Sequence, residues 1–102
     1  MSRDDIIAAL RAHEPELRAA GVRSLSLVGS AAREAQRADS DVDVLVRLVP
    51  EAMGTGFAYF GRIDALTHRL ETILKRPVDI IVEPVHKERL RRAVYRDRTV
   101  AF

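Results

Sequence analysis

Residues 41–50, DVDVLVRLVP, decide the fold of this chain. The run from residue 42 to residue 49 is rich in β-branched residues and predicts a strand, which Pro50 closes. Side chains two residues apart in a strand point to the same face, so Asp41 and Asp43 are expected to project together. On the opposite face we expect four core residues: Val42, Val44, Val46 and Leu48. Leu45 and Arg47 share the face of the two aspartates.

The segments on either side of this strand predict alternating helices and strands. We expect one helix or two short ones over residues 3–20, a strand over 22–28, a short helix over 31–36, a long helix that includes residues 57–74 and ends before Pro77, a strand over 78–82 and a last helix from about residue 86. This order predicts an α/β or α+β sandwich, in which helices flank a small sheet. With 102 residues the chain is expected to form one domain, 1–102.

The faces of the later helices can also be predicted from periodicity. In the long helix, seven residues share one face and are expected in the core: Phe57, Phe60, Ile63, Leu66, Leu70, Ile73 and Leu74. In the last helix we expect Leu90, Ala93 and Val94 to face inward.

Composition narrows the class of protein. Hydrophobic residues make up 47% and charged residues 31%, a globular balance, while aromatic residues at 5% argue against a base-stacking nucleic-acid binder. There is no cysteine, no signal-peptide pattern and no apolar run of membrane-spanning length, so we expect a cytoplasmic protein without membrane contact. The net charge is only +2, but basic residues cluster over 87–98. That cluster is either a solvated helix face or a surface for an acidic partner or phosphates.

Asp79 is the only acidic residue within the apolar strand at 78–82. If this strand pairs beside the strand at 42–49, Asp79 can lie near Asp41 and Asp43; alternatively, it simply meets solvent. Two carboxylates 4 Å apart repel by about 4 kcal/mol at an effective dielectric of 20. Because no fold needs that repulsion, the three residues are candidate ligands for Mg²⁺, which prefers oxygen atoms.

Gly29 and Ser30 lie where the strand at 22–28 turns into the short helix. Free backbone N–H groups and the helix dipole at such a turn attract phosphates. Gly29 would let a phosphate approach the backbone closely, and the Ser30 hydroxyl would add a hydrogen bond. Arg33, one turn further on, could reach a phosphate or could equally be a surface residue.

These motifs, Gly29-Ser30-Ala31-Ala32-Arg33 and Ser40-Asp41-Val42-Asp43-Val44-Leu45-Val46, resemble those of the polymerase β-type nucleotidyltransferase superfamily. The short length is similar to the minimal nucleotidyltransferases (MNT), the antitoxins paired with HEPN-domain ribonuclease toxins. The order of elements agrees along nearly the whole chain. One departure is Glu34, where family members often have glycine.

The resemblance implies a nucleotidyltransferase fold with a mixed sheet, ATP as substrate and two Mg²⁺ ions. It implies that Asp41, Asp43 and Asp79 bind the metal and carry catalysis, with Asp79 as a base. Gly29, Ser30, Arg33 and Ser40 would bind the nucleotide. The expected reaction is transfer of AMP from ATP to a tyrosine hydroxyl of the HEPN toxin, within a hetero-oligomer of the two proteins.

Two alternatives stay open beside this enzyme. One is an antitoxin without catalysis that binds and occludes the toxin. The other is transfer to a small molecule, as in aminoglycoside nucleotidyltransferases, although those enzymes usually carry an added helical domain. Binding of nucleic acid has only the basic cluster at 87–98 in its favour.

Overall fold

A computed structural model describes residues 2–33, 41–54 and 56–102. The elements in chain order are α1 (Arg3–Ala12), α2 (Glu14–Ala19), β1 (Val22–Val28), α3 (Gly29–Ala32), β2 (Val42–Leu48), the 3₁₀ helix η1 (Pro50–Ala52), α4 (Gly56–Leu74), β3 (Val78–Val82), α5 (Glu88–Asp97) and β4 (Thr99–Val100). Of the two expectations for residues 3–20, one helix or two short ones, the structure shows two short helices. The prediction of a helix over 31–36 is met by α3 only in part, and residues 34–36 lie outside the described residues.

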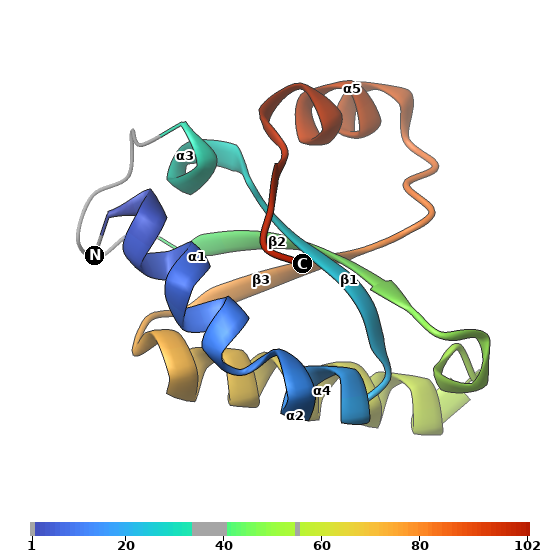
Figure 1. Ribbon diagram of the computed structural model, residues 1–102. Coiled ribbons are helices and arrows are strands. Elements are labelled where there is room, and N and C mark those ends of the chain that lie inside the picture. The colour runs from blue at the N-terminus through green and yellow to red at the C-terminus, as the bar shows by residue number, and fades with distance from the viewer. Residues whose placement is uncertain (1, 34–40, 55) are drawn as a thin grey trace.

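Four strands form one sheet in the order β3-β2-β1-β4 (Figure 1). β1 runs antiparallel to β2 and to β4, whereas β2 and β3 are parallel. α4 makes the long connection that two parallel neighbours require. The sheet is therefore mixed and flanked by helices, which confirms the predicted α+β class. The two-residue strand β4 was not predicted, because so short a segment carries no periodicity.

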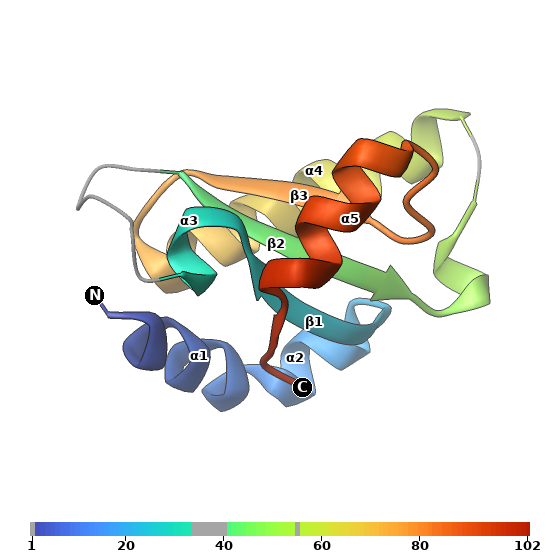
Figure 2. The same cartoon turned by 90° about the horizontal axis from the view of Figure 1, so that it is seen from above.

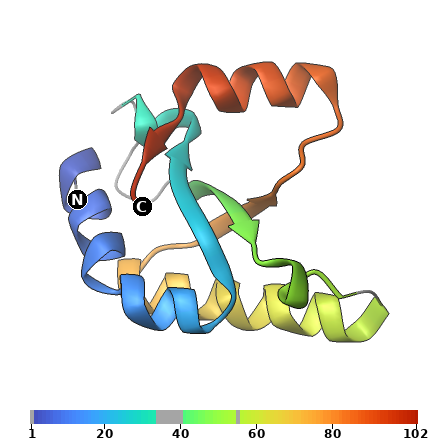
Figure 3. The ribbon, with the colours of Figure 1, turned by 45° about the vertical axis from the view of Figure 1, so that its right-hand side comes forward.

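One face of the sheet carries the main core. α1, α2 and α4 cover this face, and α5 lies on the other side (Figure 3). The core residues of β2 are the four that alternation predicted: Val42, Val44, Val46 and Leu48. At about 1.5–3 kcal/mol for each fully buried aliphatic side chain, this face supplies most of the stability.

The opposite face is partly covered by α5, which crosses above β1 and β2 (Figure 2). Val94 of α5 packs on Val28 and Leu45, and all three are at most 3% exposed. Leu45, expected beside the two aspartates, thus belongs to a second, small hydrophobic cluster. This cluster holds α5 over one part of the face and leaves the polar residues around it at the surface.

Three predicted core positions are wrong. Phe57 is 95% exposed and Phe60 is 68% exposed, because the buried residues of α4 all lie in its second half. Leu90 of α5 is also exposed, at 40%. Periodicity identified the correct face of each helix but not how far the sheet extends beneath it.

None of the helices in the described part of the chain is both long and apolar enough to cross a membrane.

Candidate active site

The pairing of β2 with β3 places two of the three predicted carboxylates side by side. Asp43 and Asp79 are register partners in this parallel pair, so both project from the face on which α5 lies. Asp41 directly precedes β2 and is exposed. The expectation that β3 lies beside β2 and brings Asp79 to Asp43 is confirmed.

The ionisation of Asp43 reflects this crowding. Partial burial raises the pKa of its carboxyl group above the ordinary value, and the negative charges of Asp79 and then Asp41 raise it further. Asp43 is therefore the carboxylate on which the charges of the other two act. A cation between them would remove the repulsion.

Gly29 lies against Asp43 at the end of β1. Its φ angle of +68° belongs to the left-handed region, and a Cβ atom at this position would lie 2.6 Å from Oδ2 of Asp43. Glycine is therefore required both by the backbone and by the closeness of the carboxylate. The N-cap of α3, Val28, makes no side-chain hydrogen bond to the first turn, so that side chain does not occupy the backbone N–H groups there.

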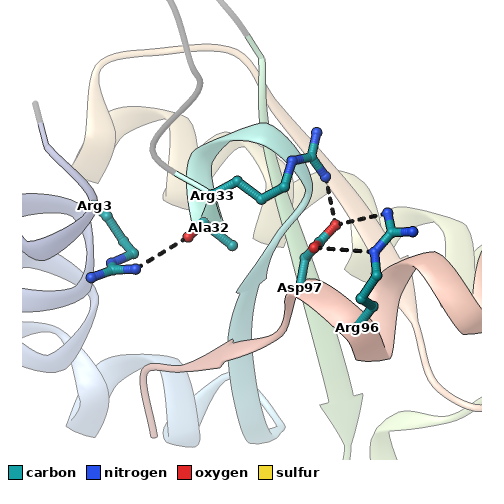
Figure 4. A network of polar contacts seen from close by, with 5 residues as sticks. All are labelled: Arg3, Ala32, Arg33, Arg96 and Asp97. Atoms are coloured by element: carbon teal, nitrogen blue, oxygen red, sulfur yellow. Dashed lines mark hydrogen bonds and ion pairs between the residues drawn. The ribbon is translucent and has the colours of Figure 1, made fainter.

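Arg33 follows α3 and forms an ion pair with Asp97 at the end of α5 (Figure 4). The Asp97 side chain is 8% exposed and also accepts hydrogen bonds from Arg96 at 3.4 Å. These two arginines, Arg96 most strongly, hold the pKa of Asp97 below its usual value. On the other side of α3, Arg3 donates to the carbonyl oxygen of Ala32 at 3.4 Å.

A cavity of about 190 Å³ joins these parts. Gly29, Arg33, Asp43 and Asp97 line it, together with apolar residues of α5 and β3. We call it the cradle cavity. It brings together three residues that sequence reasoning had proposed, and it adds Asp97, which that reasoning missed. The available signal was that Asp97 is one of only two acidic residues among the basic residues at 87–98.

Two proposed nucleotide-binding residues are less well placed or not described. Ser30 is half-buried in α3 but does not line the cradle cavity. Ser40 lies outside the described residues, as does Glu34, the departure from the family pattern.

The aspartates of the site fit a magnesium ion that would be bound partly by the protein and partly by the phosphates of the substrate. Among the described residues, no three His, Cys, Asp or Glu side chains converge closely enough to enclose a metal ion by themselves. Mg²⁺ seldom needs such a cage, because one or two carboxylates usually hold it together with water and substrate phosphates. Asp43, which lies against Gly29, and Asp41, two residues before it, supply that kind of donor set.

Residues 8–101 match the family described as nucleotidyltransferase domain, and the chain belongs to that family. It is therefore a nucleotidyltransferase by fold and by sequence. A comparison with curated protein sequences gave no match to this chain.

Among solved structures, the chain is similar to one described as a minimal nucleotidyltransferase. The TM-score is 0.75 and the identity 29%, over 97% of this chain and 95% of that one. A toxin–antitoxin structure with AMP-PNP shares the fold with a TM-score of 0.63 and 20% identity, over 100% of this chain and 73% of that one. A mutant of the toxin–antitoxin MntA-HpeT shares the fold with a TM-score of 0.60 and 18% identity, over 100% of this chain and 73% of that one.

Proposed function

We propose that this protein is an antitoxin that transfers AMP from ATP to a tyrosine hydroxyl of a HEPN ribonuclease toxin and thereby silences it. The observation that carries the proposal is the contact of Gly29 with Asp43, beside Asp79, within a nucleotidyltransferase domain. Phosphate-binding backbone and metal-binding carboxylates must be neighbours for nucleotidyl transfer, and here they touch.

Each residue then has a defined task. Asp41 and Asp43 hold the metal ions, and the backbone at Gly29 and Ser30 holds the phosphates. Arg33 can neutralise a phosphate if it exchanges its partner Asp97 for the nucleotide, as a guanidinium pairs well with either group. Bound Mg²⁺, expected as two ions, supplies charge neutralisation at the phosphates.

Asp79 is the base of the proposed reaction. It stands beside Asp43 on the outer strand of the sheet, where an acceptor can reach it. The acceptor oxygen forms a bond to the α-phosphorus, the bond between the α-phosphorus and its bridging oxygen breaks, and pyrophosphate leaves. The proton of the hydroxyl goes to Asp79.

The choice of partner rests on the likeness to a minimal nucleotidyltransferase and on the toxin–antitoxin structures that share the fold. A HEPN toxin, a hetero-oligomer with it and a cytoplasmic location remain predictions. A neighbouring reading frame with a HEPN-type R-x₄₋₆-H motif would identify the partner to use.

The test is incubation of the protein with ATP labelled at the α-phosphate, Mg²⁺ and that partner. We expect label on a partner tyrosine and loss of ribonuclease activity, both abolished by Asp41→Asn or Asp43→Asn. If wild type and Asp41→Asn neutralise the toxin equally and no label is transferred, the protein acts by occlusion. If label goes to an aminoglycoside instead, the acceptor is a small molecule.

A further inference from the structure

A second cavity lies on the same face of the sheet, along another side of α5, where Arg91 and Tyr95 line it. Its volume is about 670 Å³, and three arginines from three elements line it: Arg23 of β1, Arg47 of β2 and Arg91 of α5. We call it the arginine pocket. It is within the size range of ligand-binding pockets, whereas the cradle cavity is smaller.

The positive charge of this pocket is not balanced from within. Among the described residues, none of the three arginine side chains has a hydrogen bond or ion pair. The acidic residue in the pocket wall, Glu83, accepts a hydrogen bond from the Tyr95 hydroxyl at 2.7 Å. The three guanidinium groups therefore share the pocket with a single carboxylate, that of Glu83, and this carboxylate already accepts a hydrogen bond.

Three other arginines of this region have partners of their own. Arg92 pairs with Glu88, Arg96 with Asp97, and Arg98 donates to the Ser26 hydroxyl at 2.9 Å. The basic cluster at 87–98 is thus not a uniform solvated face. Arg92 and Arg96 pair within α5, Arg98 links the end of the helix to β1, and Arg91 joins Arg23 and Arg47 at the pocket.

The pocket lies in line with the candidate active site. Asp43 and Arg47 are four residues apart on β2 and project from the same face, a separation of about 13 Å at 3.3 Å per residue. An extended peptide has nearly the same rise per residue. If its acceptor hydroxyl lies at Asp79, side chains about four residues away lie over the arginine pocket.

We propose that the arginine pocket binds an acidic segment of the acceptor protein and so positions the acceptor hydroxyl at the carboxylates. This inference rests on the proposed function, since it assumes a protein acceptor. Carboxylate side chains pair with guanidinium groups through two parallel hydrogen bonds. The apolar walls, which include Met53 and Val85, suit the intervening apolar side chains of a peptide.

RNA fits the pocket less well. Binding of single-stranded RNA relies on several aromatic platforms along a continuous basic track. The pocket has one aromatic residue, Tyr95, and the cation of Arg98 lies over its ring, 5.9 Å from the centroid. The rest of the lining includes Pro84 and Val85, which offer neither a ring nor a charge to a nucleotide.

The proposal can be tested by fluorescence anisotropy without any nucleotide, with a fluorescein-labelled peptide of glutamate residues around one tyrosine. A matched peptide has glutamine in place of glutamate. We expect wild type to prefer the glutamate peptide. The double variant Arg47→Glu, Arg91→Glu should bind that peptide at least about tenfold more weakly, because tenfold is the loss expected for one charge-assisted hydrogen bond. Arg89→Glu, on the same helix but outside the pocket lining, should bind as wild type does.

Several outcomes would overturn the inference: equal binding of both peptides, unchanged binding by the double variant, displacement of the peptide by inorganic pyrophosphate, or tighter binding of a uridine-rich RNA at the same arginines. Circular dichroism establishes that each variant is folded.

Failure of the proposed function gives a different pattern. If the peptide binds through the arginines but no AMP is ever transferred, the function fails and the pocket assignment stands. If the double variant labels the toxin partner as fast as wild type does, the pocket assignment fails and the function stands.

Discussion

Gly29 combines a left-handed backbone conformation with close contact to the Asp43 carboxylate. An alanine there would have a positive φ and a Cβ atom 2.6 Å from the Asp43 carboxylate, so we expect Gly29→Ala to cost about 1–3 kcal/mol of stability and to abolish nucleotide binding. Gly61 is the matched control, because it lies within α4 and a Cβ atom there would contact nothing. Gly61→Ala should stabilise the protein by about 0.5–1 kcal/mol. Urea unfolding and isothermal titration with ATP and Mg²⁺ measure both effects, and a harmless Gly29→Ala would contradict the role of Gly29.

Asp43 should make the protein less stable as its carboxyl group ionises. Its pKa is raised in the folded protein, so the folded state holds the proton more tightly than the unfolded state. Its contribution to stability is therefore fully present below the unfolded pKa and is lost as the pH rises through the folded pKa. In a buffer with chelator, Asp43→Asn should raise the Tm at pH 7, and the gain should disappear below about pH 3.8, the ordinary aspartate value. A lower Tm for Asp43→Asn at pH 7 would show that the carboxylate stabilises the fold.

At the scale of elements, α5 is attached to the sheet by a small contact area. Val94 is its one buried residue and packs on Val28 and Leu45, away from the main core. Val94→Ala should cost about 2 kcal/mol and raise amide hydrogen exchange mainly in α5. Leu70→Ala, in α4 over the main core, should cost about 2–5 kcal/mol and raise exchange throughout the sheet. Equal loss of protection in both variants would mean that α5 unfolds only with the whole domain.

The central strands and the position of Asp79 could be predicted because a period of two fixes which side chains share a face. Val42 and Val44 face the core and Asp43 does not, and that follows from alternation alone. The position of α5 could not be predicted in the same way. Its periodicity shows which side is apolar but not which part of the sheet it covers, so the burial of Leu45 and the pairing of Arg33 with Asp97 were not anticipated.

The molecule as a whole has both proposed sites on one face of the sheet. The acidic residues Asp43 and Asp79 lie near the start of β2 and β3, and the arginine pocket lies near the end of β2. α5 crosses between them (Figure 2). At one end, the metal ions that accompany the nucleotide would meet the aspartates. At the other end, an acidic acceptor would meet the arginines. Under the proposed function, this separation would let a chain with a net charge of only +2 bind both ligands.

The small size of the domain should make its Tm respond strongly to a bound ligand. A domain of this size gains proportionally more from binding, and a ligand at a hundredfold excess over its Kd adds about 2.7 kcal/mol, or about 10–20 °C in Tm for a chain near 100 residues. We expect ATP with Mg²⁺ to produce such a rise in differential scanning fluorimetry, and ATP with chelator to produce little of it. Asp41→Asn is the matched variant, because Asp41 is exposed and its loss leaves the core intact. Since Asp41 is expected to act only through the metal, its variant with Mg²⁺ should behave like wild type with chelator. If ATP raises the Tm equally in all of these conditions, phosphate binding at Gly29 proceeds without the carboxylates, and the assignment of Asp41 to the metal is wrong.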